Sequence, residues 1–118
     1  MVLYYASLMA KLVYLVQDLL FVGKIRETAR QLGVEVEPAR DPRELPAQAR
    51  SAQLVIVDLR RPDAIQILKE LPREVPRIGF IDHERVDVMD AARAEGCRAY
   101  AKGKFSSELP HLIAAIAS

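Results

Sequence analysis

Hydrophobic residues in this chain occur in short uninterrupted runs rather than spread evenly. The clearest run comprises four aliphatic residues at 54–57, which show no polar alternation and are followed directly by Asp58. A strand with this pattern is apolar on both faces, as in the middle of a parallel sheet that helices cover on both sides. The pattern therefore predicts a central buried strand over residues 53–58 with a carboxylate at its C-terminal end.

Further apolar runs alternate with segments whose apolar residues recur at helical spacing. Gly33 and Gly96 are placed to end two of these helices as C-caps, and Pro72 closes another. Ser106 or Ser107 is predicted to cap the last helix, which carries an apolar stripe. The predicted strands cover residues 11–16, 34–37, 53–58, 77–81 and 98–101.

Five strands that alternate with five helices predict a single α/β domain with a parallel sheet. Right-handed crossovers would give a doubly wound, three-layer α/β/α sandwich. Asp41 and Pro42 are expected to open the second helix, which Pro46 disturbs. The domain is expected to span residues 11–118, preceded by an apolar N-terminal extension at residues 1–10.

Composition excludes several classes of function. The net charge is +1, with 17 basic and 16 acidic residues spread along the chain, which argues against a nucleic-acid partner. The single cysteine, Cys97, excludes an internal disulfide and favours a reducing cytoplasm. Lys11 and Asp18 interrupt the apolar start of the chain, so no membrane span is expected. No glycine-rich nucleotide-binding loop is present.

Several residues share the spacing of a known family. Asp18 follows the first predicted strand, Asp58 ends the third, and Pro62 comes four residues later. Tyr100 lies in the fifth strand, and Phe105 precedes the last predicted helix. Over residues 11–117 the chain thus resembles the receiver domain of two-component response regulators. The resemblance implies a flavodoxin-like fold with strand order 2-1-3-4-5, a role in two-component signalling or a phosphorelay, and no enzymatic activity.

The resemblance also implies a phosphorylation site at the C-terminal edge of the sheet. With strands one and three adjacent, Asp18 and Asp58 would meet there, and Gln17 would add a third oxygen. Such a set attracts a hard cation such as Mg²⁺. The metal would screen Asp58 as phospho-acceptor, and Lys102 or Lys104 would neutralise the phosphoryl oxygens.

Parts of the family pattern are missing from this chain. Gln17 stands where the family has a first acidic residue, and Ile81 stands where it keeps a hydroxyl side chain. The lysine position falls on Gly103. Lys102 and Lys104 flank that position, but a shift of one residue turns a side chain away, so both are also interpreted as solvated loop charges.

Each remaining residue also has a structural interpretation. Asp58 is alternatively a strand-end carboxylate that pairs with Arg60 or Arg61, whose guanidinium would then take the role of the cation. Asp18 is alternatively the N-cap of the first helix. Tyr100 is alternatively a half-buried core residue.

The pattern of kept and missing residues favours a stand-alone pseudo-receiver, which acts through protein–protein contact without efficient phosphotransfer. Its expected partner is another protein, contacted through a face around Tyr100, Phe105 and Leu109, and a homodimer is expected. One alternative is a working receiver that accepts phosphate on Asp58 with Mg²⁺. A second alternative is a small-molecule sensor that binds at the C-terminal ends of the strands.

Overall fold

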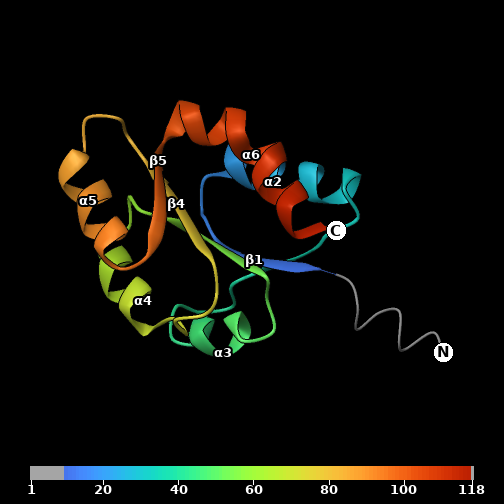
Figure 1. Ribbon diagram of the computed structural model, residues 1–118, viewed down its shortest axis with the longest axis horizontal. Helices are drawn as coiled ribbons and strands as arrows, with labels where there is room; N and C mark the ends of the chain where they lie inside the picture. The colour runs from blue at the N-terminus through green and yellow to red at the C-terminus, as the bar shows by residue number, and fades with distance from the viewer. Residues whose placement is uncertain (1–9, 118) are drawn as a thin grey trace.

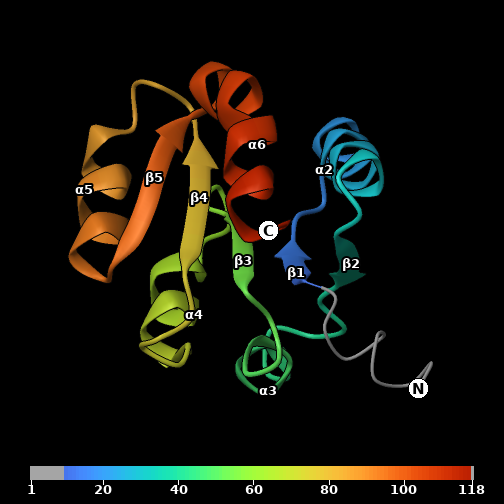
Figure 2. The same cartoon turned by 45° about the vertical axis from the view of Figure 1, so that its right-hand side comes forward.

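The computed structural model describes residues 10–117 as one parallel five-stranded sheet flanked by helices. The strand order is β2-β1-β3-β4-β5, which confirms the predicted flavodoxin-like topology. Figure 2 shows the strand arrows pointing the same way, so all C-terminal strand ends lie along one edge of the sheet. The strands are β1 (Lys11–Leu15), β2 (Glu35–Pro38), β3 (Leu54–Asp58), β4 (Arg77–Ile81) and β5 (Cys97–Ala101).

The helices form two outer layers (Figure 1). Helices α2 and α6 cover one face of the sheet, and α3, α4 and α5 cover the other. The helices are α2 (Leu19–Gln31), α3 (Leu45–Ala49), α4 (Ala64–Glu70), α5 (Val86–Ala94) and α6 (Lys102–Ala117).

The central strand β3 is buried along its whole length, as its uninterrupted apolar run predicts. Val55 and Val57 pack into the core beneath α3, α4 and α5. Leu54 and Ile56 face the second core, which α2 and α6 close. The sheet thus separates two hydrophobic cores, and β3 contributes to both because successive side chains of a strand alternate between its faces.

Two predicted helix starts are wrong. Helix α6 begins at Lys102, immediately after β5, so Ser106 and Ser107 lie inside the helix rather than at its cap. Asp41 accepts a hydrogen bond from the backbone N–H of Arg43 at 2.8 Å and belongs to a turn that precedes the short helix α3. Pro46 lies in the first turn of α3, where a proline breaks no backbone hydrogen bond.

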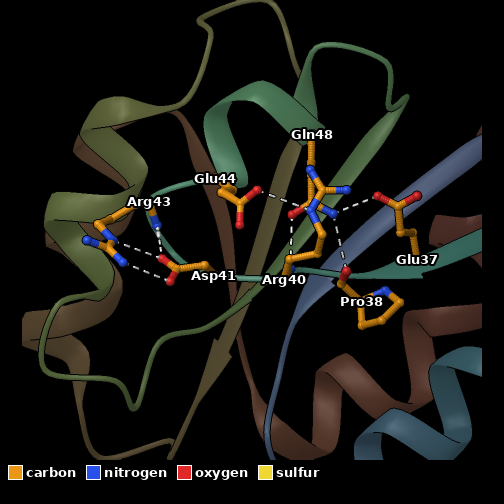
Figure 3. Close-up of polar contacts among 7 residues, drawn as sticks. All are labelled: Glu37, Pro38, Arg40, Asp41, Arg43, Glu44 and Gln48. Carbon is orange, nitrogen blue, oxygen red and sulfur yellow. Dashed lines mark hydrogen bonds and ion pairs between the residues drawn. The ribbon is translucent and has the colours of Figure 1, made fainter.

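The connection from β2 to α3 is held by a buried glutamine (Figure 3). Gln48 donates from Nε2 to the carboxylate of Glu37 at 2.6 Å and to the carbonyl of Pro38 at 3.2 Å. Its Oε1 accepts from the backbone N–H of Arg40 at 3.0 Å. The hydrogen bond from Gln48 and the ammonium of Lys11 outweigh partial desolvation and lower the pKa of Glu37. These contacts fix the short α3 against the edge strand.

Most of the predicted N-terminal extension, residues 1–9, lies outside the described residues. Within residues 10–117, no helix combines the length and the apolar character that crossing a membrane requires. Cys97 is the first residue of β5, and its side chain is buried.

Candidate functional site

Two carboxylates meet at the C-terminal edge of the sheet. Strands β1 and β3 are hydrogen-bonded neighbours, so the residues that follow β1 approach the end of β3. Arg60 bridges the two acids: its Nη2 lies 2.7 Å from Asp58 Oδ2 and 3.4 Å from Asp18 Oδ2. The structure therefore brings together the two acids that the sequence singled out. An open pocket at this edge is lined by Gln17, Asp18, Asp58, Arg60, Arg61, Pro62 and Asp63.

The contact between Arg60 and Asp58 is bidentate. Arg60 donates from Nε to Asp58 Oδ1 at 2.9 Å and from Nη2 to Oδ2 at 2.7 Å, and its backbone N–H adds a third bond at 3.0 Å. Asp58 is only 5% exposed, so this pairing compensates an otherwise buried charge. The hydrogen bonds that the Asp58 carboxylate accepts raise the pKa of Arg60. The structural interpretation of Asp58 as the partner of Arg60 therefore describes this conformation.

An aromatic cluster lies beneath the guanidinium of Arg60. The guanidinium carbon is 5.5 Å from the centre of the Phe80 ring, within the range of a cation–π contact. Phe80 in turn lies 4.6 Å, between ring centres, from both Phe21 and Phe105. Arg60 is thus held between two carboxylates and a cluster that joins α2, β4 and α6.

Asp18 is the N-cap of α2 as well as a neighbour of Arg60. Its Oδ1 accepts from the backbone N–H of Leu20 at 2.9 Å and of Phe21 at 3.4 Å. Partial desolvation acts to raise the pKa of Asp18, but these amides and Arg60 together lower it. The capping interpretation is confirmed, and it coexists with the position beside Asp58.

The expected lysines do not reach Asp58. Lys102 Nζ lies 3.1 Å from Asp82 Oδ1, in an ion pair that links α6 to the end of β4. Lys104 is exposed in the first turn of α6. Ile81 is only 2% exposed and presents no hydroxyl group. The described residues thus offer no side chain in the role of the family's lysine or hydroxyl.

The oxygen donors at this edge suit a hard cation by type, because carboxylates and amide oxygens are ligands of Mg²⁺. Gln17, Asp18 and Asp58 would supply them from one pocket. No cluster of three or more acidic, histidine or cysteine side chains is arranged to hold a metal within residues 10–117. The guanidinium of Arg60 already satisfies the acids, so a metal would have to displace it.

The residues expected at a protein contact face differ in accessibility. Tyr100 is partly exposed, consistent with either a contact residue or a half-buried core residue. Phe105 is fully buried and Leu109 is only 1% exposed, because both side chains face the core under α6. Neither is available to a partner in this conformation. No sequence pattern indicated that Phe80 supports the site. The pairing of Asp58 with Phe80 across β3 and β4 places Phe80 there.

Comparisons with known proteins identify the fold of this chain through similar solved structures. No family model matches the chain, and no curated protein matches it. Among solved structures, a response-regulator receiver domain from Clostridium thermocellum superimposes with a TM-score of 0.76 at 21% identity, over 92% of this chain and 94% of that chain. The CheY-like protein TadZ from Pseudomonas aeruginosa gives a TM-score of 0.73 at 20% identity, over 91% and 98%. This chain has the receiver-domain fold.

A third receiver domain, from a sensor histidine kinase of Pseudomonas aeruginosa, gives a TM-score of 0.68 at 17% identity. It covers 92% of this chain and 98% of its own, and it holds a magnesium ion coordinated in its active-site cleft. In the present receiver fold, the acids Asp18 and Asp58 contact an arginine instead. The two carboxylates are therefore present, and a positive side chain is already bound to them.

Proposed function

We propose that this chain is a pseudo-receiver: a signalling or regulatory protein-interaction module without efficient phosphotransfer. The observation that supports the proposal is the bidentate ion pair between Arg60 and Asp58, with Asp18 on the same guanidinium. The side chain that would accept phosphate and a side chain that would bind the metal share one internal cation. The receiver fold is kept while its chemical centre is neutralised from within the chain.

Competition explains why this arrangement opposes phosphotransfer. A carboxylate whose oxygens accept from a guanidinium has fewer lone pairs free for attack on phosphorus. A divalent cation would have to break the contacts of Arg60 with both acids before it bound. Because the Asp58 carboxylate is buried, its ion pair is weakly screened by solvent and salt.

The absence of a hydroxyl side chain and of a free lysine at the site also opposes phosphotransfer. A transferred phosphoryl group needs hydrogen-bond donors and a positive charge placed where its negative charge develops. Ile81 supplies neither, and the ammonium of Lys102 is engaged with Asp82. Even after Arg60 moved away, the described site would lack these helpers.

One observation favours the alternative of a working receiver. Asp18, Asp58 and Gln17 do line a single pocket, as a Mg²⁺ site requires. Arg60 is 31% exposed as a side chain and enters from a loop, so its rotation toward solvent would uncover the acids. On this alternative, Mg²⁺ replaces Arg60 and Asp58 accepts phosphate.

Intact-mass measurement after incubation with Mg²⁺ and acetyl phosphate distinguishes the pseudo-receiver from the working receiver. We expect no phosphoryl adduct on the parent protein. An adduct on the parent that Asp58→Asn abolishes would overturn the pseudo-receiver assignment.

Calorimetric titration with Mg²⁺ tests the role of Arg60 directly. Arg60→Met removes the competing charge and is expected to raise the Mg²⁺ affinity about tenfold or more. Arg61→Met is the matched control, because Arg61 pairs with Asp63 at 2.9 Å rather than with Asp58. Equal affinities for Arg60→Met and the parent would show that Arg60 does not compete with the metal.

The proposed partner is another protein, and its contact face would include the partly exposed Tyr100 with the outer sides of α5 and β5. Val86 on α5 is 54% exposed, although it is a large apolar residue. A homodimer through this face is the simplest assembly. Light scattering over a range of concentrations that detected only monomer would remove the dimer from the proposal.

A further inference from the structure

A pocket at the N-terminal edge of the sheet carries charged side chains of both signs that form no ion pairs. We call it the Arg77 pocket. It lies between the end of α4, the start of β4 and the turn from α5 to β5, and Figure 2 shows these strand starts along the edge opposite the arrowheads. Its charged lining residues are Lys69, Arg73, Glu74, Arg77 and Glu95. Among residues 10–117, none of the five takes part in a salt bridge.

The pocket at the opposite, C-terminal edge of the sheet is arranged differently. Its charged side chains are all joined in ion pairs: Asp18 and Asp58 with Arg60, and Arg61 with Asp63. That pocket is neutralised by side chains of the chain itself. In the Arg77 pocket, both signs of charge remain available to a ligand.

Arg77 brings a buried charge to this pocket, since it is only 6% exposed. Its guanidinium has five N–H donors. Nε and Nη2 donate to the carbonyls of Val75 and Pro72, and Nη1 donates to that of Leu68. These contacts occupy the Nε–H, both N–H groups of Nη2 and one of Nη1, so the second N–H of Nη1 has no partner among the described residues. A buried cation with a spare donor and no carboxylate partner within residues 10–117 is a binding point for an anionic group.

The rim of the Arg77 pocket adds charges of both signs. Lys69 and Arg73 are exposed cations at the end of α4 and in the turn after it. Glu74 is an exposed acid in the same turn, and Glu95 is a partly exposed acid in the turn before β5. A simple anion would be attracted by the cations but repelled by the two acids. A ligand that carries both a carboxylate and an ammonium group would be attracted by both sets.

We propose that the Arg77 pocket binds a free amino acid, with its carboxylate at Arg77 and Lys69 and its ammonium at Glu95. Because cations and acids line one pocket of about 380 Å³, the two charges of the ligand must be close together, as they are in an amino acid. That volume lies at the lower end of the range for small-molecule sites. The site is separate from the carboxylates at the C-terminal edge, so its ligand does not compete with Mg²⁺ or phosphate for them.

An NMR titration of the full chain with the standard amino acids, one at a time at millimolar concentration, provides the direct test. At least one of them is expected to shift the amide resonances of Val75, Ala94 and Gly96, which line the pocket, until the site is saturated. The amides of Asp18 and Arg60, at the opposite edge, should keep their resonances. The same amino acid should raise the midpoint of thermal unfolding, because a ligand that binds only the folded state stabilises it. If no amino acid shifted the pocket resonances, the proposal would be overturned.

Two derivatives of the amino acid that binds test whether both of its charges are recognised. Its amide lacks the carboxylate, and its N-acetyl form lacks the ammonium. Each is expected to bind at least about tenfold more weakly than the free amino acid, because each loses one set of charged contacts. If the N-acetyl form bound as tightly as the free amino acid, the pocket would be a site for simple anions and the proposal would be wrong.

Substitutions at the rim locate the site without disturbing the buried Arg77. Lys69→Met and Glu95→Gln each remove one charge of the pocket and are expected to weaken binding of the amino acid by about fivefold. Lys24→Met and Glu84→Gln are the matched controls, because both residues are exposed and neither lines the pocket. The controls should keep the affinity of the parent. Unchanged affinity in both rim variants, or equal losses in the rim variants and the controls, would overturn the proposal.

Discussion

Two arginines at opposite edges of the same sheet are held in different ways. Arg60, at the C-terminal edge, pairs with the carboxylates of Asp58 and Asp18 in an open pocket. Arg77, at the start of β4, is 6% exposed and has no carboxylate partner among the described residues. Its guanidinium donates instead to backbone carbonyls: those of Leu68 at 3.0 Å, Val75 at 3.1 Å and Pro72.

The kind of partner determines what each arginine can do. The carbonyls around Arg77 belong to the end of α4 and the turn after it, groups that a helix terminus leaves without partners. The carbonyls of Leu68 and Pro72 also accept from the backbone N–H groups of Leu71 and Val75, so Arg77 supplies their second hydrogen bond and ties the end of α4 to the turn after it. The carboxylates around Arg60 can accept a metal ion in its place. The comparison assigns a structural role to Arg77 and an exchangeable one to Arg60.

The largest effect is expected from Arg77→Met. The substitution keeps much of the apolar stem but removes the donors. The carbonyls of Leu68 and Pro72 each lose one of two hydrogen bonds, and the carbonyl of Val75 loses its bonds to the guanidinium. We expect the free energy of unfolding to fall by about 3 kcal/mol in a denaturant titration. Arg73→Met, at an exposed position four residues earlier, should change it by about 0.5 kcal/mol or less. A loss below about 1 kcal/mol for Arg77→Met would show that water can satisfy these carbonyls and that the contrast with Arg60 is weak.

Gly79→Ala should lower the free energy of unfolding by less than Arg77→Met does. It disturbs Leu59, the residue that positions the loop carrying Arg60. A Cβ at position 79 would lie 2.6–2.8 Å from three side-chain atoms of Leu59, the buried residue that precedes Arg60. Leu59 must then move, which overpacking data suggest costs about 1–3 kcal/mol in unfolding free energy. Adding Leu59→Ala removes the collision.

A double-mutant cycle checks this explanation. In the Leu59→Ala background, Gly79→Ala should cost clearly less than it does in the parent, since the colliding atoms are gone. Additive effects of the two substitutions would mean that the loop which carries Arg60 is not positioned by Leu59 against β4.

The fold and the positions of the two acids at the site could be predicted from the sequence. Uninterrupted apolar runs identified β3 and β4 nearly to the residue, because strands buried on both faces tolerate no polar alternation. Adjacent parallel strands then placed Asp18 and Asp58 at one edge. The start of α6 was missed because Lys102, Gly103 and Lys104 contain no apolar residue and no usual cap.

Tertiary contacts account for the rest of what the sequence did not predict. Gln48 and Arg77 look like surface residues in the sequence, and only the folded chain shows the backbone groups that they satisfy. The apolar stripe of α6 correctly identified Leu109, but that same stripe faces the core, so it cannot also form a contact face. An apolar residue on a helix does not reveal by itself which surface it packs against.

The smallest expected effect is a change in how stability depends on pH when the charge of Asp18 is removed. The pKa of Asp18 is lowered in the folded protein, so its contribution to stability is complete above the unfolded pKa and is lost as the pH falls through the folded one. Asp18→Ser keeps a side-chain oxygen that can cap α2 but removes the charge beside Arg60. Its unfolding midpoint should therefore depend less on pH below about 4 than that of the parent. Asp18→Ala removes the cap as well and should lower the midpoint at every pH. If Asp18→Ser retained the full pH dependence of the parent, the charge of Asp18 would carry no stability through either the backbone amides of α2 or Arg60, and Arg60 would be held by Asp58 alone.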